Sequence, residues 1–209
     1  MRAIIFDLDN CLAPSDEPSR DLLEPVFRAV RETNRGRLSE EELQAAFDEC
    51  WVRAFDAVAR EHGFSDEMRE AGWREFARVE VTVPMRGYGD LDVLPQLGHR
   101  RFLVTSGFRR LQESKVHALG IADVFDEVVI DALDEPGRRG KERVFADLLA
   151  RHCLDRTDVL VVGDDPDSEL ASARKLGIRA VQTVRPGIEP ASDLQHVRDL
   201  GELRDLLNR

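Results

Sequence analysis

Two aspartates, Asp7 and Asp9, follow an apolar run at the start of the chain. Residues 3–6 and Leu8 suit a fully buried strand, and such a strand has no place for a carboxylate. The two acids therefore mark the point where a strand ends and a loop begins. Two carboxylates one residue apart repel each other unless a cation or a shared proton relieves them. This conflict of charge favours a site of chemistry over the simpler alternative of solvated residues that cap the next element.

Three further strand-like runs are followed by polar side chains. These are Thr105, Ser106 and Gly107 after the second strand, Lys141 after the third, and Asp164 and Asp165 after the fourth. Because the carboxyl ends of parallel strands meet at one edge of a sheet, we expect all of them to converge with the first two aspartates. A hydroxyl, a lysine and two pairs of acids are the groups that handle a phosphoryl group with a divalent metal ion.

Each of these residues also has a structural alternative. Thr105 could simply end a strand, and Asp164 with Asp165 could cap a helix. Lys141 could be a surface residue, although a cation is unfavourable in the first turn of a helix unless an anion such as phosphate lies beside it. The order of all these groups along the chain, each at a strand end, favours the catalytic interpretation.

A long insert separates the first strand from the second. The second strand begins more than ninety residues after Asp7, far beyond the few dozen that a direct crossover needs. Apolar residues recur at helical spacing over 22–30, 43–58 and 68–79. Ser39 with Glu42 forms a capping-box signature before the middle helix. We expect residues 14–89 to form an all-helical lid over the carboxyl edge of a sheet domain built from 1–13 and 90–209.

The chain after the insert alternates between strand and helix. The predicted strands cover 101–107, 126–130, 159–162 and 179–184, and the predicted helices cover 109–119, 141–152, 168–176 and 194–207. Such alternation implies right-handed crossovers and a parallel sheet with helices on both faces. The predicted fold class is α/β.

The composition narrows the setting and the partners. A net charge of −11 argues against a nucleic-acid polymer as partner. No apolar run approaches the ~18 residues that a membrane span needs, and no signal-peptide pattern opens the chain. Cys11, Cys50 and Cys153 are odd in number and lack a C-x-x-C spacing, which is typical of reduced thiols. We expect a cytoplasmic protein with no membrane partner, and the oligomeric state stays open.

These motifs resemble those of the haloacid dehalogenase-like superfamily of phosphatases over nearly the whole chain. The matching segments are 6–10, 104–107, 140–141 and 162–165, and the insert is similar to the family's helical cap of the first type. The resemblance implies a Rossmann-like core with a mobile cap. It also implies a Mg²⁺-dependent phosphatase that hydrolyses small phosphate monoesters, such as a sugar phosphate, phosphoglycolate or a nucleoside monophosphate.

The resemblance further implies a role for each site residue. Asp7 is implied as the nucleophile that forms an aspartyl-phosphate intermediate, and Asp9 as the general acid and base. The implied phosphate-binding residues are Thr105, Ser106, Gly107 and Lys141, and the implied metal-binding residues are Asp7, Asp9 through its main-chain carbonyl, Asp164 and Asp165. The chain departs from the family pattern at Cys11, where threonine is usual, and at Ser168, where many members carry an acid. Either Asp165 or Glu169 supplies that missing carboxylate.

Other activities within the superfamily give competing hypotheses. A sugar phosphomutase uses the same two aspartates, and a catalytically silent binding protein could keep the fold. Haloacid dehalogenation needs neither a proton donor nor a metal, so Asp9 and Asp164 argue against it. Phosphonate hydrolysis needs a lysine from the cap, whereas the first lysine here is Lys115, beyond the insert.

Overall fold

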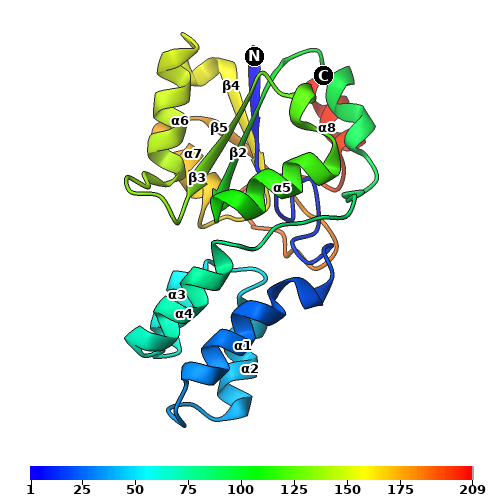
Figure 1. Cartoon of the computed structure of the whole chain (residues 1–209). Helices are drawn as coiled ribbons and strands as arrows, with labels where there is room; N and C mark the ends of the chain where they lie inside the picture. The colour runs from blue at the N-terminus through cyan, green and yellow to red at the C-terminus, as the bar shows by residue number, and fades with distance from the viewer. Residues whose placement is uncertain (209) are drawn as a thin grey trace.

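Six parallel strands form one sheet within residues 1–208, which the computed structural model describes (Figure 1). The strands are β1 (Ala3–Phe6), β2 (Arg100–Gly107), β3 (Glu127–Ala132), β4 (Val159–Gly163), β5 (Arg179–Thr183) and β6 (Gln195–Val197). Their spatial order is β3-β2-β1-β4-β5-β6, and every pairing is parallel. This order is Rossmann-like, with a topological switch point between β1 and β4, so the predicted α/β fold is confirmed.

Helices cover both faces of this sheet (Figure 1). They are α5 (Arg109–Leu119), α6 (Gly140–Arg151), α7 (Glu169–Leu176) and α8 (Leu200–Leu207), together with the short 3₁₀ segments η2 (Leu91–Leu97), η3 (Ala122–Val124) and η4 (Arg156–Asp158). Side chains alternate along β1: Ile4 and Phe6 pack in one cluster with α5 and α8, and Ile5 packs in the other with α6 and α7. All three are fully buried, which explains why β1 reads as a continuous apolar run.

The inserted segment folds into helices that lie beyond the carboxyl ends of the strands (Figure 1). They are η1 (Arg20–Leu23), α1 (Glu24–Thr33), α2 (Glu40–Glu49), α3 (Phe55–Glu61) and α4 (Asp66–Phe76). The predicted capping box is present, because the Ser39 hydroxyl accepts from the Glu42 N–H and the Glu42 carboxylate accepts from the Ser39 N–H. The helices share their own apolar cluster, which includes the buried Val30, Phe47 and Val58. We call residues 14–89 the helical segment.

Two helix predictions were wrong. The apolar spacing over 43–58 predicted one helix, but α2 ends at Glu49 and α3 begins at Phe55. Val52, which the pattern placed inside, is 67% exposed in the intervening turn. The predicted terminal helix over 194–207 begins only at Leu200. The preceding residues pair with β5 as strand β6, and Asp199 caps the helix by accepting from the Glu202 N–H at 2.7 Å.

The two ends of the helical segment are tied to each other, and the returning end packs closely against the chain at Leu12. The Glu17 carboxylate accepts from the backbone N–H groups of Arg86 at 2.5 Å and Gly87 at 3.0 Å, which ties the outgoing and returning chains together. A Cβ at position 87 would lie 2.6 Å from the Leu12 carbonyl oxygen, so only glycine permits this approach. No helix in residues 1–208 is long and apolar enough to cross a membrane.

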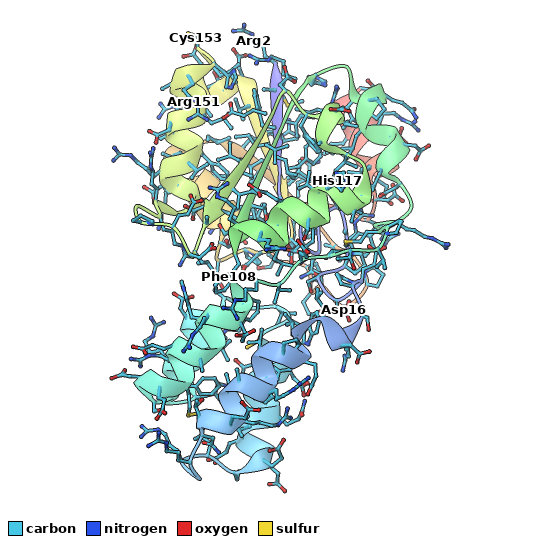
Figure 2. All side chains as sticks on the ribbon, viewed as in Figure 1. Arg2, Asp16, Phe108, His117, Arg151 and Cys153 are labelled. Carbon is cyan, nitrogen blue, oxygen red and sulfur yellow. The ribbon has the colours of Figure 1, made fainter. Side chains whose placement is uncertain are left out.

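Phe108, at the junction labelled in Figure 2, joins the helical segment to the sheet domain. Its ring stacks on Phe76 at a centroid distance of 4.7 Å and meets Trp73 edge-on at 4.8 Å. Because Phe108 is buried, Phe108→Ala is expected to lower the free energy of unfolding by about 3 kcal/mol, through lost burial and the cavity left behind.

Urea unfolding followed by circular dichroism measures this change. Val52→Ala, at an exposed position of the helical segment, is the control and should shift stability by less than about 0.5 kcal/mol. A loss no larger than that of the control would show that Phe108 does not couple the two parts.

Candidate active site

Asp7 is the first residue after β1 and lies at the switch point of the sheet. Its N–H donates to the Val162 carbonyl of β4 at 2.9 Å, which fixes its backbone between the two central strands. The whole residue is only 7% exposed. The chain then turns sharply through Asn10, which has φ 56° and whose side-chain oxygen accepts from the Ser15 N–H at 3.1 Å. The turn returns the chain toward the helical segment and leaves Asp7 facing the edge of the sheet.

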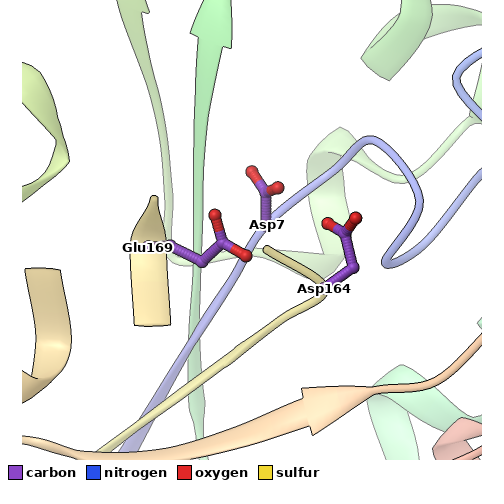
Figure 3. A group of neighbouring side chains, drawn as sticks. All are labelled: Asp7, Asp164 and Glu169. Carbon is purple, nitrogen blue, oxygen red and sulfur yellow. The ribbon is translucent and has the colours of Figure 1, made fainter. Parts of the chain in front are cut away.

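A buried acidic cluster forms around Asp7 (Figure 3). Asp164, directly after β4, and Glu169, the first residue of α7, each bring a carboxylate oxygen within 4.8 Å of one on Asp7 and of one another. A Cβ at position 163 would lie 2.3 Å from the Glu169 Oε1, so the glycine that ends β4 makes room for that carboxylate. Glu169 is 1% exposed and accepts from the Asp165 N–H at 2.7 Å. The fold thus holds three carboxylates together out of solvent.

Lys141 partly compensates the charge of this cluster. Its Nζ lies 2.8 Å from Asp7 Oδ1 and 2.8 Å from Glu169 Oε2. The start of α6 is held in place by Asp131 at the end of β3, whose buried carboxylate accepts from the N–H groups of Arg139 at 3.0 Å and Gly140 at 3.3 Å. Asp131 therefore determines where Lys141 enters the site.

The electrostatics of the cluster follow from burial and crowding. Burial raises the pKa of Asp7 to about 7, with Lys141 opposing the rise and Glu169 adding to it. Burial, followed by repulsion from Asp7 and Glu169, raises the pKa of Asp164 to about 8. Burial alone would lower the pKa of Lys141, but its two anionic neighbours more than offset this and raise it.

Three carboxylates with one lysine leave an excess of negative charge. Hard carboxylate oxygens are the ligands that Mg²⁺ and Ca²⁺ prefer. A divalent cation would also relieve the repulsion that raises the two aspartate pKa values. The donor set of Asp7, Asp164 and Glu169 therefore fits a divalent metal ion.

Asp9 and Thr105 are linked to each other through α5. Asp9 Oδ1 is 2.6 Å from Lys115 Nζ, and its Oδ2 accepts from the Gln112 side-chain N–H at 2.8 Å. The same Gln112 nitrogen donates to the Thr105 hydroxyl oxygen at 2.8 Å. Because Thr105 accepts this bond, its own O–H remains free to donate toward a substrate oxygen.

One cavity of about 510 Å³ brings the predicted residues together. Its lining includes Asp7, Asp9, Thr105, Ser106, Gly107, Lys141, Asp164 and Asp165. Asp165 lines the cavity but does not belong to the compact acidic cluster, whereas Glu169 does. The helical segment closes the opposite side, mainly through the turn over residues 50–55 and Phe76. Within that turn Arg53 is held by Glu49 at 2.5 Å and Glu61 at 2.7 Å.

Sequence reasoning missed three polar residues of the site: Gln112, Lys115 and Asp131. All three are buried. Gln112 and Lys115 share a face of α5 with the buried Val116, and polar side chains at such positions of a helical pattern were an available signal. Asp131 directly follows the predicted strand 126–130, so the strand-end signal that identified the other residues could have found it, although β3 itself runs to Ala132.

Comparison with known proteins identifies the family. A model of the haloacid dehalogenase-like hydrolases matches residues 1–177. The chain belongs to the haloacid dehalogenase-like hydrolase family. Among its relatives, a glyceraldehyde 3-phosphate phosphatase of Methanopyrus kandleri is 28% identical, covering 92% of this chain and 89% of that protein. A phosphoserine phosphatase of Thermus thermophilus is 26% identical, covering 97% of this chain and 98% of that protein.

Solved structures of the family share the fold at low sequence identity. A HAD phosphatase from Thermococcus onnurineus superposes with a TM-score of 0.65 at 20% identity, covering 99% of this chain and 98% of that one. A 2-haloacid dehalogenase from Pseudomonas syringae gives a TM-score of 0.57 at 18% identity, covering 100% of this chain and 99% of that one. Because the same fold carries both reactions, the site residues must decide the activity.

Proposed function

We propose that this family member is a Mg²⁺-dependent phosphatase that hydrolyses small phosphate monoesters through an aspartyl-phosphate on Asp7. The observation that carries the proposal is the pairing of two differently placed aspartates in one cavity. Asp7 is buried against Lys141 and two further acids, while Asp9 is partly exposed and held by Lys115. A dehalogenase requires no second aspartate and no metal cluster, so this pair favours phosphoryl transfer.

The proposed chemistry assigns each residue a separate task. An Asp7 oxygen attacks phosphorus, the bond from phosphorus to the ester oxygen breaks, and Asp9 gives its proton to that leaving oxygen. Asp9 then takes a proton from the water that attacks phosphorus and releases Asp7. Thr105 donates to a phosphoryl oxygen, and Lys141 offsets the charge that develops there. Asp7, Asp164 and Glu169 would hold the Mg²⁺ ion, which would supply the positive charge that lets an anionic nucleophile approach an anionic ester.

The position of the cavity supports the proposed domain roles. Residues 14–89 act as a cap over a catalytic domain of 1–13 and 90–209, since both parts line the same space. A volume of about 510 Å³ is within the usual range for a metabolite site. Both curated relatives are named for three-carbon phosphate esters, which favours a small phosphorylated metabolite as substrate.

Phosphate release from p-nitrophenyl phosphate and a panel of metabolite monophosphates, with Mg²⁺ and with EDTA, tests the proposal. We expect Mg²⁺-dependent release, and the panel then ranks the substrates. Movement of phosphate to a second position of a sugar, without release, would instead identify a phosphomutase. No turnover of any ester by folded, Mg²⁺-loaded protein would contradict the proposal.

Mg²⁺ affinity is expected to increase with pH. The metal-free protein holds protons on Asp7 and Asp164, whose pKa values are about 7 and 8, and the cation must displace them. Affinity should therefore rise by about 50-fold from pH 6 to 7, where nearly two protons leave per ion, and by about tenfold from pH 7 to 8, before it levels off at higher pH. Calorimetric titration in two buffers of different ionisation enthalpy counts the released protons.

A matched pair of variants tests which acid completes the metal site. Glu169→Gln removes a carboxylate of the buried cluster and should weaken Mg²⁺ binding about tenfold or more. Asp165→Asn changes an acid next to the cluster and should leave the affinity within about threefold of the wild-type value. The opposite order would assign the metal to Asp165.

A further inference from the structure

We propose that Lys115 and Gln112 are positioning residues that hold the Asp9 carboxylate in place for proton transfer. The inference rests on the proposed phosphatase function and adds two residues of α5 to it. Both oxygens of Asp9 are engaged from this single helix, Oδ1 by Lys115 at 2.6 Å and Oδ2 by Gln112 at 2.8 Å. Asp9 thus has a defined orientation before any substrate enters.

Lys115 is placed where a charge is costly. Its side chain is only 7% exposed, and an ammonium this deeply buried is tolerated only with an anionic partner. Among residues 1–208, Asp9 is the one carboxylate within ion-pair distance of it. The neighbouring Val116 is apolar and buried, so a hydrophobic residue would have packed on this face at lower cost. The lysine is therefore explained by Asp9 rather than by the packing of α5.

Gln112 connects the proton-transfer group to the phosphate-binding strand. Its side-chain nitrogen lies 2.8 Å from both Asp9 Oδ2 and Thr105 Oγ1, and 3.1 Å from the Ser106 carbonyl oxygen. Its own Oε1 is buried without a partner among the described residues. Turning the amide over would place that oxygen against the Asp9 carboxylate, so the anion explains the orientation. One amide therefore fixes the separation of Asp9 from Thr105.

These contacts leave the Asp9 carboxyl group able to transfer a proton. Each carboxylate oxygen has two lone-pair positions, so one contact per oxygen leaves room for the proton that is transferred. The Asp9 side chain remains 26% exposed, and the residue lines the cavity. Because α5 belongs to the sheet domain, the restraint does not depend on where the helical segment lies. The substrate's leaving oxygen should meet a pre-oriented carboxyl group.

The leaving group of the substrate provides the test. Nitrophenolate departs without a proton, whereas an alkoxide needs one, so a misplaced general acid slows only the second kind of ester. The first turnover is measured by rapid mixing. In this experiment Lys115→Met should release alcohol from an alkyl phosphate about 100-fold more slowly than the wild type, and its half-saturating substrate concentration should stay within about threefold of the wild-type value. Phosphoserine is the alkyl probe, or the fastest alcohol ester of the panel. Release of nitrophenolate in the first turnover should change by less than about threefold.

Matched variants separate positioning from damage to the fold. Lys175→Met removes the exposed lysine of α7, whose side chain is 67% exposed, and should leave both rates unchanged. Lys115→Arg retains a cationic donor and should recover part of the loss. If Lys115→Met does not fold, Gln112→Met removes one of the two Asp9 contacts and should show the same selective loss.

Each remaining outcome counts against the inference. Equal losses on the two esters would make Lys115 a structural or phosphate-binding residue, and no loss on either would make it dispensable. In both cases an active wild-type enzyme would leave the proposed function intact. A wild-type protein inactive on both esters would overturn the proposed function, and this inference with it.

Discussion

Asp7→Asn is expected to abolish turnover while the protein still folds. An amide cannot attack phosphorus to form the intermediate, so the rate should fall by at least about 10⁴-fold, the scale of loss when a covalent nucleophile is removed. Folding should survive because asparagine has nearly the same shape and removes a carboxylate that crowds Asp164 and Glu169. Lys141 loses one partner but keeps Glu169 at 2.8 Å.

Steady-state phosphate release measures this loss, and thermal unfolding verifies the fold. Asp16→Asn makes the same chemical change at an exposed position of the following loop and should retain wild-type activity. Turnover by Asp7→Asn at the wild-type rate would refute the assignment of the nucleophile. Retained turnover in the presence of EDTA would refute the metal requirement while leaving Asp7 in place.

Local signals predicted much of the fold. The helix over 109–119 was located to the residue, because Gly107 precedes it and Gly120, with φ 65°, ends it. The errors arose where distant pairing decides the structure. Strand β6 forms because it pairs with β5 at the sheet edge, and the local sequence pattern over 194–207 does not indicate that pairing. The chain also turns between α2 and α3, although the apolar periodicity of the sequence continues through that turn.

The sequence predicted the site from the polar residues that follow four of the strands. The residues predicted from the four strand ends line one cavity because a parallel sheet brings its carboxyl ends to one edge. Whether Asp165 or Glu169 joins the acidic cluster depends on the close approach of a side chain to β4, which no sequence pattern indicates. The missing side chain at Gly163 lets Glu169 turn back against β4. Predicting Lys115 as a site residue would have required knowing which face of α5 packs on the sheet.

The two aspartates lie in different environments, which match the separate tasks proposed for them. Asp7 is buried among acids beside Lys141, and a bound divalent cation would oppose the rise in its pKa and keep it the anion that the proposed attack requires. Asp9 lines the cavity, where the proposed mechanism has it exchange a proton with the leaving group and with water. Removing the Asp9 carboxyl group should therefore slow different steps of the reaction for different esters.

Asp9→Asn is expected to lower steady-state turnover of an alkyl phosphate by about 10²- to 10⁴-fold, because it removes both the acid and the base. With p-nitrophenyl phosphate the first step needs no proton, so nitrophenolate should appear in a burst of about one equivalent before a slow steady state. Asp7 should then accumulate as the phosphorylated residue, which peptide mass spectrometry of the acid-quenched enzyme detects. A uniform slowing with no burst would contradict the general-base role.

The combination of Asp9→Asn with Lys115→Met extends this test to the restraint on Asp9. If the lysine acts only through the aspartate, the double variant should be no slower on an alkyl phosphate than Asp9→Asn alone, because residues that work as a unit are not additive. Independent contributions would instead multiply the two losses. A multiplied loss would show that Lys115 contributes independently of Asp9, and a rate no lower than that of Asp9→Asn would establish that it acts through the Asp9 carboxylate, 2.6 Å away.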